Sequence, residues 1–210
     1  MTLVLVRHGR TAANASGLLL GRADPPLDDT GQRQADALAG CLEAADVTAV
    51  VTSPLERARA TADAIAARHG AEVRVDDRWI ELDYGALDGA LPGDVAADVW
   101  QAWRADPAYR PPGGESLADL GRRVREACGG LASGAAEGTV VVVSHVSPVK
   151  AAVAWALRVG DEIAWRMHLD VASITRIRTT AAGEAAALLS FNEIAHLGEL
   201  RAGSRRSGGE

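Results

Sequence analysis

Short apolar runs alternate along the chain with longer segments whose apolar residues recur every three or four positions. The runs have the length of strands and the periodic segments have the length of helices. This pattern predicts strands over residues 2–6, 47–53, 71–77, 139–145, 172–180 and 186–193. It predicts helices over residues 30–45, 54–70, 95–106, 116–132 and 148–160. Such alternation is typical of an α/β three-layer sandwich, with a mostly parallel central sheet and helices on both faces.

Proline, glycine and serine predict where several of these elements begin and end. We expect Pro54 and Pro148 to open helices, because proline is favoured in the first helical turn. Ser116 is a candidate N-cap, and Gly70 is placed to end its helix. A turn at Gly183 would join the last two strands.

Charge and composition exclude some classes of function. The 210 residues carry a net charge of −6, so no global basic field is available to hold nucleic acid or an anionic membrane. No apolar run approaches the ~20 residues that span a bilayer, and the N-terminus lacks the features of a signal peptide. Cys41 and Cys128 are far apart and show no metal-like spacing. We therefore expect a soluble cytoplasmic protein; homo-oligomerisation is left open.

Reactive side chains follow the predicted strands. Arg7 and His8 end the first strand, and His145 ends the strand of four consecutive valines. Arg57 lies one turn into a helix that follows another strand, and Glu81 comes shortly after the third. Ligands of open α/β sheets bind beyond the carboxyl ends of the strands, so we expect these five side chains to meet at one edge.

This set of side chains suits phosphoryl transfer. Guanidinium groups match the oxygens of a phosphoryl group, and a neutral imidazole can act as a nucleophile that carries a covalent intermediate. A carboxyl group can protonate the leaving oxygen. Arginines and a second histidine can supply the charge stabilisation without a metal ion.

Six ordered segments resemble the histidine phosphatase superfamily, whose members are phosphoglycerate mutase-like proteins. The strongest is LVRHGRTAAN, which carries the Arg-His-Gly signature of that family. The others are GRADPPLDDTGQRQA (21–35), TSPLERARATA (52–62), ELDYGALDG (81–89), GGES (113–116) and VVVVSH (140–145). A single short motif would be weak evidence, whereas six in the family's order are strong.

The resemblance implies a role for each reactive residue. His8 would be the nucleophile that forms a phosphohistidine, and Arg7, Arg57 and His145 would hold the transferring phosphoryl group. Glu81 would protonate the leaving alcohol and then help to activate water. The candidates for binding substrate are Asn14, Gly21 and Val146. The resemblance implies that no metal or organic cofactor is needed.

Some positions depart from the family's pattern. Val146 follows the second histidine where the family usually has glycine, and it could narrow the phosphate site or restrict the backbone there. Leu20 is apolar where a polar residue is often found, Leu87 replaces a common tryptophan, and Lys150 stands where arginine is common. We interpret Lys150 as structural or peripheral. Arg10 has no assigned role.

The resemblance also implies one histidine phosphatase domain over residues 1–200, with a lid-like insertion around 85–114 and a disordered tail over 201–210. The insertion is short and acidic, with Arg104 and Arg110 as its only cations, which favours hydrolysis over mutase chemistry. Trp100, Trp103 and Tyr84 are candidate contacts to substrate, although both tryptophans could simply pack the helix.

The leading hypothesis is a phosphomonoesterase acting on a small phosphorylated metabolite. Three alternatives remain: a phosphoglycerate mutase, a metal-dependent hydrolase with His8, His145 and Glu81 as ligands, and a catalytically impaired homologue that binds phospho-ligands, with Val146 as the damaging change. The substrate is open among sugar phosphates, nucleotide-like phosphates such as α-ribazole phosphate, and other small phosphorylated metabolites.

Overall fold

A central sheet of six strands organises the fold. The computed structural model describes residues 1–134, 138–180 and 185–201. Within them the strand order is β3-β2-β4-β1-β5-β6. The strands are β1 (Thr2–Arg7), β2 (Val47–Thr52), β3 (Val73–Val75), β4 (Thr139–Ser144), β5 (Ile174–Thr179) and β6 (Ala186–Glu193). The first four are mutually parallel; β5 pairs antiparallel with β1, and β6 pairs antiparallel with β5.

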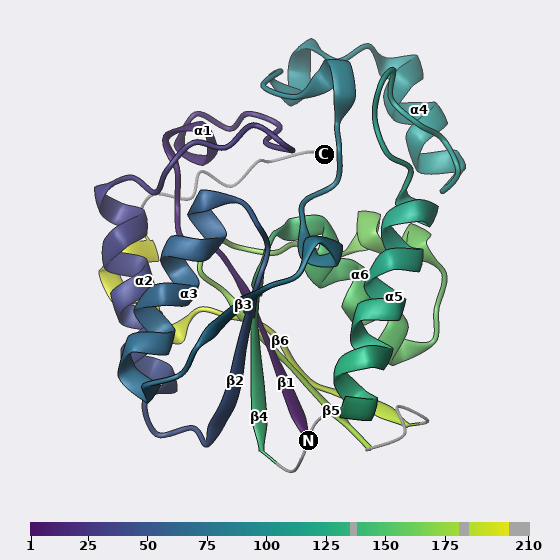
Figure 1. The fold of residues 1–210 in the computed structure, drawn as a ribbon. Coiled ribbons are helices and arrows are strands. Elements are labelled where there is room, and N and C mark those ends of the chain that lie inside the picture. Colours follow the sequence, from purple (N-terminus) through teal and green to yellow (C-terminus); the bar gives the residue numbers. More distant parts are fainter. Residues whose placement is uncertain (135–137, 181–184, 202–210) are drawn as a thin grey trace.

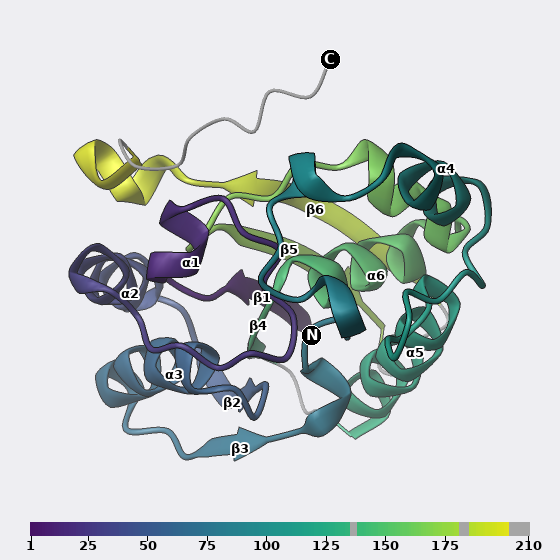
Figure 2. The same ribbon diagram turned by 90° about the horizontal axis from the view of Figure 1, so that it is seen from above.

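Helices cover both faces of this sheet (Figures 1 and 2). The pair α2 (Asp29–Leu42) and α3 (Glu56–His69) packs on one face, and the pair α5 (Leu117–Gly134) and α6 (Val146–Leu157) packs on the other. Short α1 (Ala12–Ala15) and α4 (Ala97–Ala105) lie beyond the sheet. The 3₁₀ segments are Asp77–Trp79, Gly85–Leu87, Pro92–Asp94, Asp161–Arg166 and Ala195–Arg201. The predicted α/β sandwich with a mostly parallel sheet is confirmed.

Strand β1 shows why its sequence is apolar throughout. Val4 and Val6 belong to the core beneath α2 and α3, whereas Leu3 and Leu5 belong to the core beneath α5 and α6. Successive side chains of a strand point to opposite faces, so a strand covered on both faces needs apolar residues at every position. All four side chains are fully buried.

Three predicted helix starts are wrong by two residues. Helix α4 begins at Ala97 instead of 95, and the other two starts were placed at prolines. Helix α6 begins at Val146, with His145 as its extended N-cap, so Pro148 is the third helical residue rather than the first. The N–H groups of the first turn have no acceptor within the helix. Proline is tolerated there because its missing N–H costs no intrahelical hydrogen bond. Helix α3 begins at Glu56, after Pro54. Gly70 ends α3 in the left-handed conformation, as predicted.

Other differences lie at the margins of the fold. Strand β3 has three residues instead of seven, and it pairs only with β2 at the edge of the sheet. The four-residue α1 and the 3₁₀ segments were not predicted, because pieces this short carry no usable periodicity. The turn at Gly183 and residues 202–210 of the predicted tail lie outside the described residues; Arg201 ends a 3₁₀ segment.

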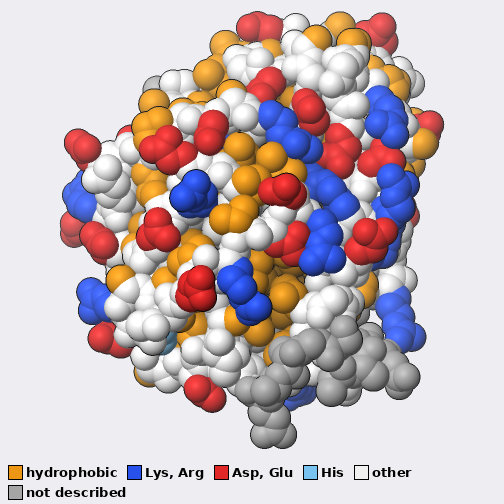
Figure 3. Space-filling model, viewed as in Figure 1, with side chains coloured by type: hydrophobic (Ala, Val, Ile, Leu, Met, Phe, Trp, Pro, Cys, Tyr) orange, Lys and Arg blue, Asp and Glu red, His pale blue; other side chains and the backbone are white. Residues whose placement is uncertain are grey.

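The surface carries mixed charge. The face in Figure 3 shows acidic and basic side chains interspersed. Ion pairs along α5 contribute to this mixture, including Arg122 with Asp119 and Arg125 with Asp161. In the part of the chain that the structure describes, no helix is both long and apolar enough to cross a membrane.

The parallel strands end at one edge of the sheet, which is the upper edge in Figure 1. The loop after β1 leads there into α1, and the segment around 85–114, which contains α4, rises above the same edge. The fold therefore gathers the residues that follow β1, β2 and β4 beneath this segment.

Candidate active site

His8 directly follows β1 and lies in the interior. Its backbone N–H donates to Ser144 O at 3.0 Å, and the residue is only 2% exposed. The ring Nδ1 lies 2.7 Å from Gly9 O. A carbonyl oxygen can only accept, so this bond assigns the hydrogen to Nδ1 and leaves the lone pair on Nε2.

The surroundings of His8 keep the ring neutral. Burial lowers the pKa of His8 well below its usual 6.5, and the positive charges of Arg57 and Arg7 lower it further. A neutral imidazole with an unprotonated Nε2 is the form that can attack phosphorus, and here that nitrogen accepts a hydrogen bond of 3.3 Å from Arg57 Nε. The site thus holds the His8 ring in its neutral form at neutral pH.

Gly9 allows the chain to turn against α2. A Cβ at Gly9 would collide with the backbone of Gly31, and its N–H donates to Thr61 Oγ1 at 3.1 Å. Only glycine permits this approach, so Gly9 fixes the loop whose carbonyl orients His8.

Arg57 reaches His8 from the first turn of α3. Its guanidinium is completely buried, and its Nε lies 3.3 Å from His8 Nε2. The other two nitrogens donate to Gly21 O at 2.8 Å and to Ala23 O at 2.7 Å. These carbonyls fix the plane of the guanidinium beside the ring of His8.

Arg7 is oriented by a loop before β5. One terminal nitrogen donates to Leu169 O at 2.6 Å, while Nε is buried without a hydrogen-bond partner. Burial lowers the pKa of Arg7 to about 10, so the group remains charged at neutral pH. The loop is itself held by reciprocal hydrogen bonds of 2.8 and 2.9 Å between Asp170 and Asn192.

His145 completes the cluster from the end of β4. Its ring centroid lies 5.0 Å from that of His8, and its Nε2 lies 2.7 Å from Ser53 Oγ. Burial and the neighbouring His8 lower the pKa of His145 well below 6.5. Its Nδ1 is buried without a partner, like Arg7 Nε. Buried polar atoms nearly always have a hydrogen-bond partner. Two such atoms without one in a single cluster are explained by a functional site.

Glu81 is held at the edge of the cluster by backbone amides. Its Oε1 accepts from Leu82 N at 2.7 Å and from Ser147 N, at the start of α6, at 3.2 Å. The residue is 3% exposed. Its charge acts on both Arg7 and Arg57, which places the carboxyl group in the same electrostatic unit as the two arginines.

The three proposed binding residues have clear structural positions. Asn14 forms the capping box of α1, with its Oδ1 accepting from Thr11 N at 3.1 Å. Gly21 places its carbonyl on Arg57, and a Cβ there would lie 2.9 Å from Leu82 O. Both positions therefore have a structural role that needs no substrate.

Val146 is the first residue of α6. Among the described residues, Arg158, Ala172 and Asn192 are the non-glycines with positive φ, so the backbone at Val146 does not require glycine. We expected valine to restrict the backbone here, but φ at Val146 is negative, which valine adopts readily.

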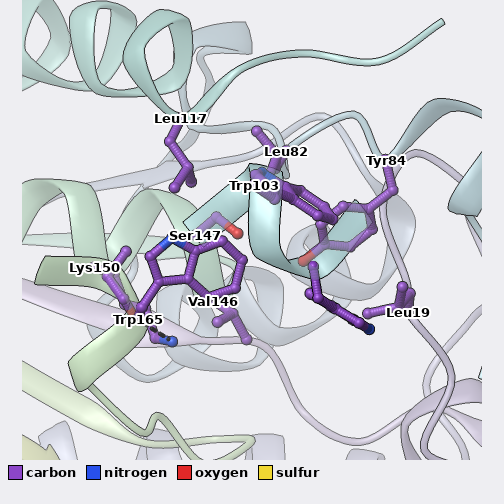
Figure 4. Close-up of a pocket in the computed structure, with 11 residues that line it drawn as sticks. Leu19, Leu82, Tyr84, Trp103, Leu117, Val146, Ser147, Lys150 and Trp165 are labelled. Carbon is purple, nitrogen blue, oxygen red and sulfur yellow. Dashed lines mark hydrogen bonds between the residues drawn. The ribbon is translucent and has the colours of Figure 1, made fainter. Parts of the chain in front are cut away.

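A cavity of about 100 Å³ adjoins the cluster (Figure 4). Its lining comes from the segments after Glu81 and His145, the insertion, and the 3₁₀ segment Asp161–Arg166. The lining residues are Leu19, Leu82, Tyr84, Trp100, Trp103, Leu117, Val146, Ser147, Lys150, Ala164 and Trp165. Figure 4 shows the rings of Trp103 and Tyr84 near that of Trp165, with Ser147 beside it.

Sequence reasoning missed three residues of this region. Ser53, bonded to His145, ends a buried strand just before a helix, and that position is a usable signal. Lys150 lines the cavity and is not peripheral, which its spacing of four residues from Val146, one helical turn, could have indicated. Trp165 lies in a 3₁₀ segment whose position no sequence pattern reveals.

Two further residues are structural. Arg10 forms an ion pair with Asp28 at 2.9 Å. Leu87 packs against the core beside α5 and α6, as a packing replacement would.

In the described ranges, no group of three or more histidine, cysteine, aspartate or glutamate side chains is arranged to hold a metal ion. His8 and His145 instead face arginines, whose charge opposes a cation. The geometry thus offers no support for the hypothesis in which His8, His145 and Glu81 bind a metal.

Several curated proteins are similar to this chain in sequence. A bifunctional protein of Mycobacterium tuberculosis is 40% identical over 177 residues, which cover 82% of this chain and 49% of the relative. The chain therefore spans about half the length of that relative. Phosphoserine phosphatase 1 of Hydrogenobacter thermophilus is 34% identical, covering 94% of this chain and 95% of the relative. A probable phosphoglycerate mutase of Yersinia enterocolitica is 32% identical, covering 84% of each chain.

Solved structures share the whole fold. A mycobacterial glucosyl-3-phosphoglycerate phosphatase superposes with a TM-score of 0.82 at 30% identity, covering 92% of this chain and 99% of the other. A phosphoserine phosphatase mutant from Entamoeba histolytica superposes with a TM-score of 0.85 at 26% identity, covering 93% and 98%. The model of the histidine phosphatase superfamily (branch 1) matches residues 3–192. With the clustered His8, Arg57 and His145, this match shows that the chain belongs to the histidine phosphatase superfamily.

Proposed function

We propose that this chain is a phosphomonoesterase that hydrolyses a small phosphorylated metabolite through a phosphohistidine on His8. One observation carries the proposal: a buried, neutral His8 whose Nδ1 is bonded to Gly9 O and whose Nε2 faces Arg57 at 3.3 Å. A ring held in this tautomer beside fixed positive charge is prepared to attack a phosphoryl group.

The reaction proceeds in two steps. In the first, the His8 Nε2 lone pair forms a bond to phosphorus as the bond from phosphorus to the alcohol oxygen breaks, and the carboxyl group of Glu81 gives its proton to that oxygen. In the second, water attacks phosphorus, Glu81 takes a proton from the water, and the bond to Nε2 breaks. Inorganic phosphate leaves, and both side chains return to their starting states.

Arg7, Arg57 and His145 hold the phosphoryl oxygens in this proposal. Arg7 Nε and His145 Nδ1 are buried and lack partners, so each has hydrogen-bonding capacity to offer. Asn14 supplies a further contact, while Gly21 and Val146 shape the approach. Arginines and a histidine spread the developing charge without a metal or organic cofactor.

The relatives support hydrolysis. Two of them are named as phosphatases, one of phosphoserine and one of glucosyl-3-phosphoglycerate. Because another relative is named as a probable phosphoglycerate mutase, mutase activity is the second candidate function of this chain. The adjoining cavity favours hydrolysis, since Lys150 is its sole cationic lining residue and a mutase must hold a second phosphate.

The proposal also covers the domain organisation of the enzyme, its compartment and the kind of molecule on which it acts. Residues 85–114 act as a lid over the site within a single domain of residues 1–200, and the protein works in the cytoplasm on a free small molecule. Cys128 is buried and Cys41 exposed, and both are free thiols, which suits a reducing compartment. Light scattering after gel filtration measures whether the chain forms a homo-oligomer.

A phosphate-release assay over a panel of metabolites, with and without chelator, tests this function. We expect release that survives chelator and is abolished in His8→Ala. Turnover that depends on a bisphosphorylated primer and yields little free phosphate would favour the mutase. Tight binding of vanadate without turnover would favour the impaired binding homologue.

A further inference from the structure

The cavity beside the cluster starts at the proposed proton donor. Leu82 follows Glu81, and Ser147 N donates to Glu81 Oε1 at 3.2 Å, so two lining residues adjoin the carboxyl group. Val146 follows His145 directly. If Glu81 protonates the leaving oxygen, the group attached to that oxygen enters this cavity. This step rests on the proposed function.

The walls are aromatic and fixed. Trp100 and Trp103 stack with centroids 5.6 Å apart and planes inclined by 13°. Trp165 stands nearly perpendicular to both, at 6.1 and 5.6 Å, and Tyr84 meets Trp103 edge-on at 5.7 Å. Aromatic contacts favour these offset-stacked and edge-to-face geometries.

Several contacts hold these rings in place before any ligand arrives. Trp103 is 1% exposed and belongs to the core beneath α5 and α6. Trp100 Nε1 donates to Pro92 O at 3.1 Å. The Arg104 guanidinium lies 5.8 Å from the centroid of Trp100 and 5.9 Å from that of Trp165. A cavity built in advance binds a matching group without paying to order its walls.

Charged partners in the cavity are few. The polar groups of the lining are Ser147, Lys150, the Tyr84 hydroxyl and the indole N–H groups, of which those of Trp103 and Trp165 are buried without a hydrogen-bond partner. The rest of the lining consists of leucine, valine and alanine side chains and aromatic faces. Lys150 Nζ already donates to Ala164 O at 3.0 Å. Burial and the charge of Arg7 lower the pKa of Lys150 to about 8, so the amine stays mostly protonated at neutral pH but loses its proton more easily than an ordinary lysine. A carboxylate in this cavity would lie mainly against aromatic faces.

The cavity is also small. Its volume of about 100 Å³ is below the ~150 Å³ that a dry cavity needs to take up benzene, but this one opens to the surface, so one ring can enter. A nucleoside or disaccharide would extend outside it. From the walls, the polar partners and the volume we propose that the leaving group is a single flat, uncharged ring on a short link to the phosphate.

The test compares phosphate esters of primary alcohols, so that the chemistry at the leaving oxygen is similar. Benzyl phosphate carries the flat ring, cyclohexylmethyl phosphate a bulky apolar ring, and ethyl phosphate no ring. We expect kcat/KM for benzyl phosphate to exceed that for ethyl phosphate by about 30-fold. We expect it to exceed that for cyclohexylmethyl phosphate by about threefold, because a flat ring gains aromatic contacts.

Two matched tryptophan variants locate the effect. Trp165→Leu should lower the ratio of the benzyl to the ethyl value about fivefold, because one aromatic wall is lost. Trp155→Leu removes the tryptophan of α6 that is outside the cavity lining, and it should leave the ratio within about twofold of wild type. A ratio cancels any general loss of folded protein.

The outcomes separate this inference from the proposed function. A benzyl to ethyl ratio near one, or a cyclohexylmethyl value equal to the benzyl value, would each overturn the inference while leaving a phosphatase. If no ester releases phosphate, the proposed function fails. Tryptophan fluorescence titrations then decide the inference: tighter binding of benzyl than of ethyl phosphate supports it, and equal binding overturns it.

Discussion

The two halves of the candidate site are built on opposite principles. The half that would hold the phosphoryl group consists of buried polar side chains at strand ends, and backbone carbonyls and amides fix most of them. The half that would hold the leaving group consists of aromatic side chains from the insertion and from the segment Asp161–Arg166, fixed by packing. In our proposal, the first half serves the chemistry common to phosphate esters, and the second selects among them.

Removing the nucleophile should have the largest effect. We expect His8→Ala to lower kcat/KM by more than about 10⁴-fold for every ester, because His8 Nε2 is the imidazole nitrogen that Arg57 Nε reaches at 3.3 Å. Steady-state phosphate release measures this loss, and retained binding of vanadate shows that the pocket has survived. Release at the wild-type rate would remove His8 from the mechanism.

The proton donor should matter next. Glu81→Gln keeps an oxygen able to accept from Leu82 N and Ser147 N, but it cannot transfer a proton. We expect kcat to fall about 10²- to 10³-fold for alkyl phosphates. The fall should be much smaller for p-nitrophenyl phosphate, whose leaving group needs no proton. Equal losses for both esters would contradict the role of Glu81.

A positioning effect should follow. Ser53→Ala removes the 2.7 Å hydrogen bond to His145 Nε2, and we expect kcat to fall about tenfold with little change in KM. Ser53→Thr retains the hydroxyl group and should recover most of the rate. If Thr rescues no better than Ala, the serine serves packing rather than the orientation of His145.

The smallest effect concerns pH. His8 and His145 have folded-state pKa values below 6.5, so the unfolded chain binds more protons than the folded chain as the pH falls through 6.5. Stability is therefore full above pH 6.5 and declines below it. We expect Tm to fall by several degrees between pH 7 and pH 5, and to fall less in His8→Ala. Equal slopes in both proteins would argue against a neutral buried His8.

The same contrast explains what the sequence could predict. The phosphoryl half follows from local pattern, since apolar strands ending in Arg7-His8 and in His145 meet at one edge in any parallel sheet. Arg57 follows β2 and Glu81 follows β3 in the sequence, and both residues lie at this same edge of the sheet.

The leaving-group half depends on contacts between distant segments. Trp165 meets Trp100 and Trp103 only through the placement of a 3₁₀ segment that has no periodicity. Lys150 lines the cavity one helical turn after Val146, in a helix whose observed start lies two residues before the predicted one. Patterns within a segment cannot fix such long-range packing, which is why the insertion was predicted as a lid and its wall partner was missed.

Trapping the covalent intermediate tests the central claim most directly. Wild-type protein is mixed with a ³²P-labelled ester, quenched within milliseconds, and digested for mass spectrometry. The account predicts an acid-labile, base-stable phosphoryl label on the peptide that contains His8, absent from His8→Ala and longer-lived in Glu81→Gln. Rapid phosphate release with no label on that peptide at any time would contradict it.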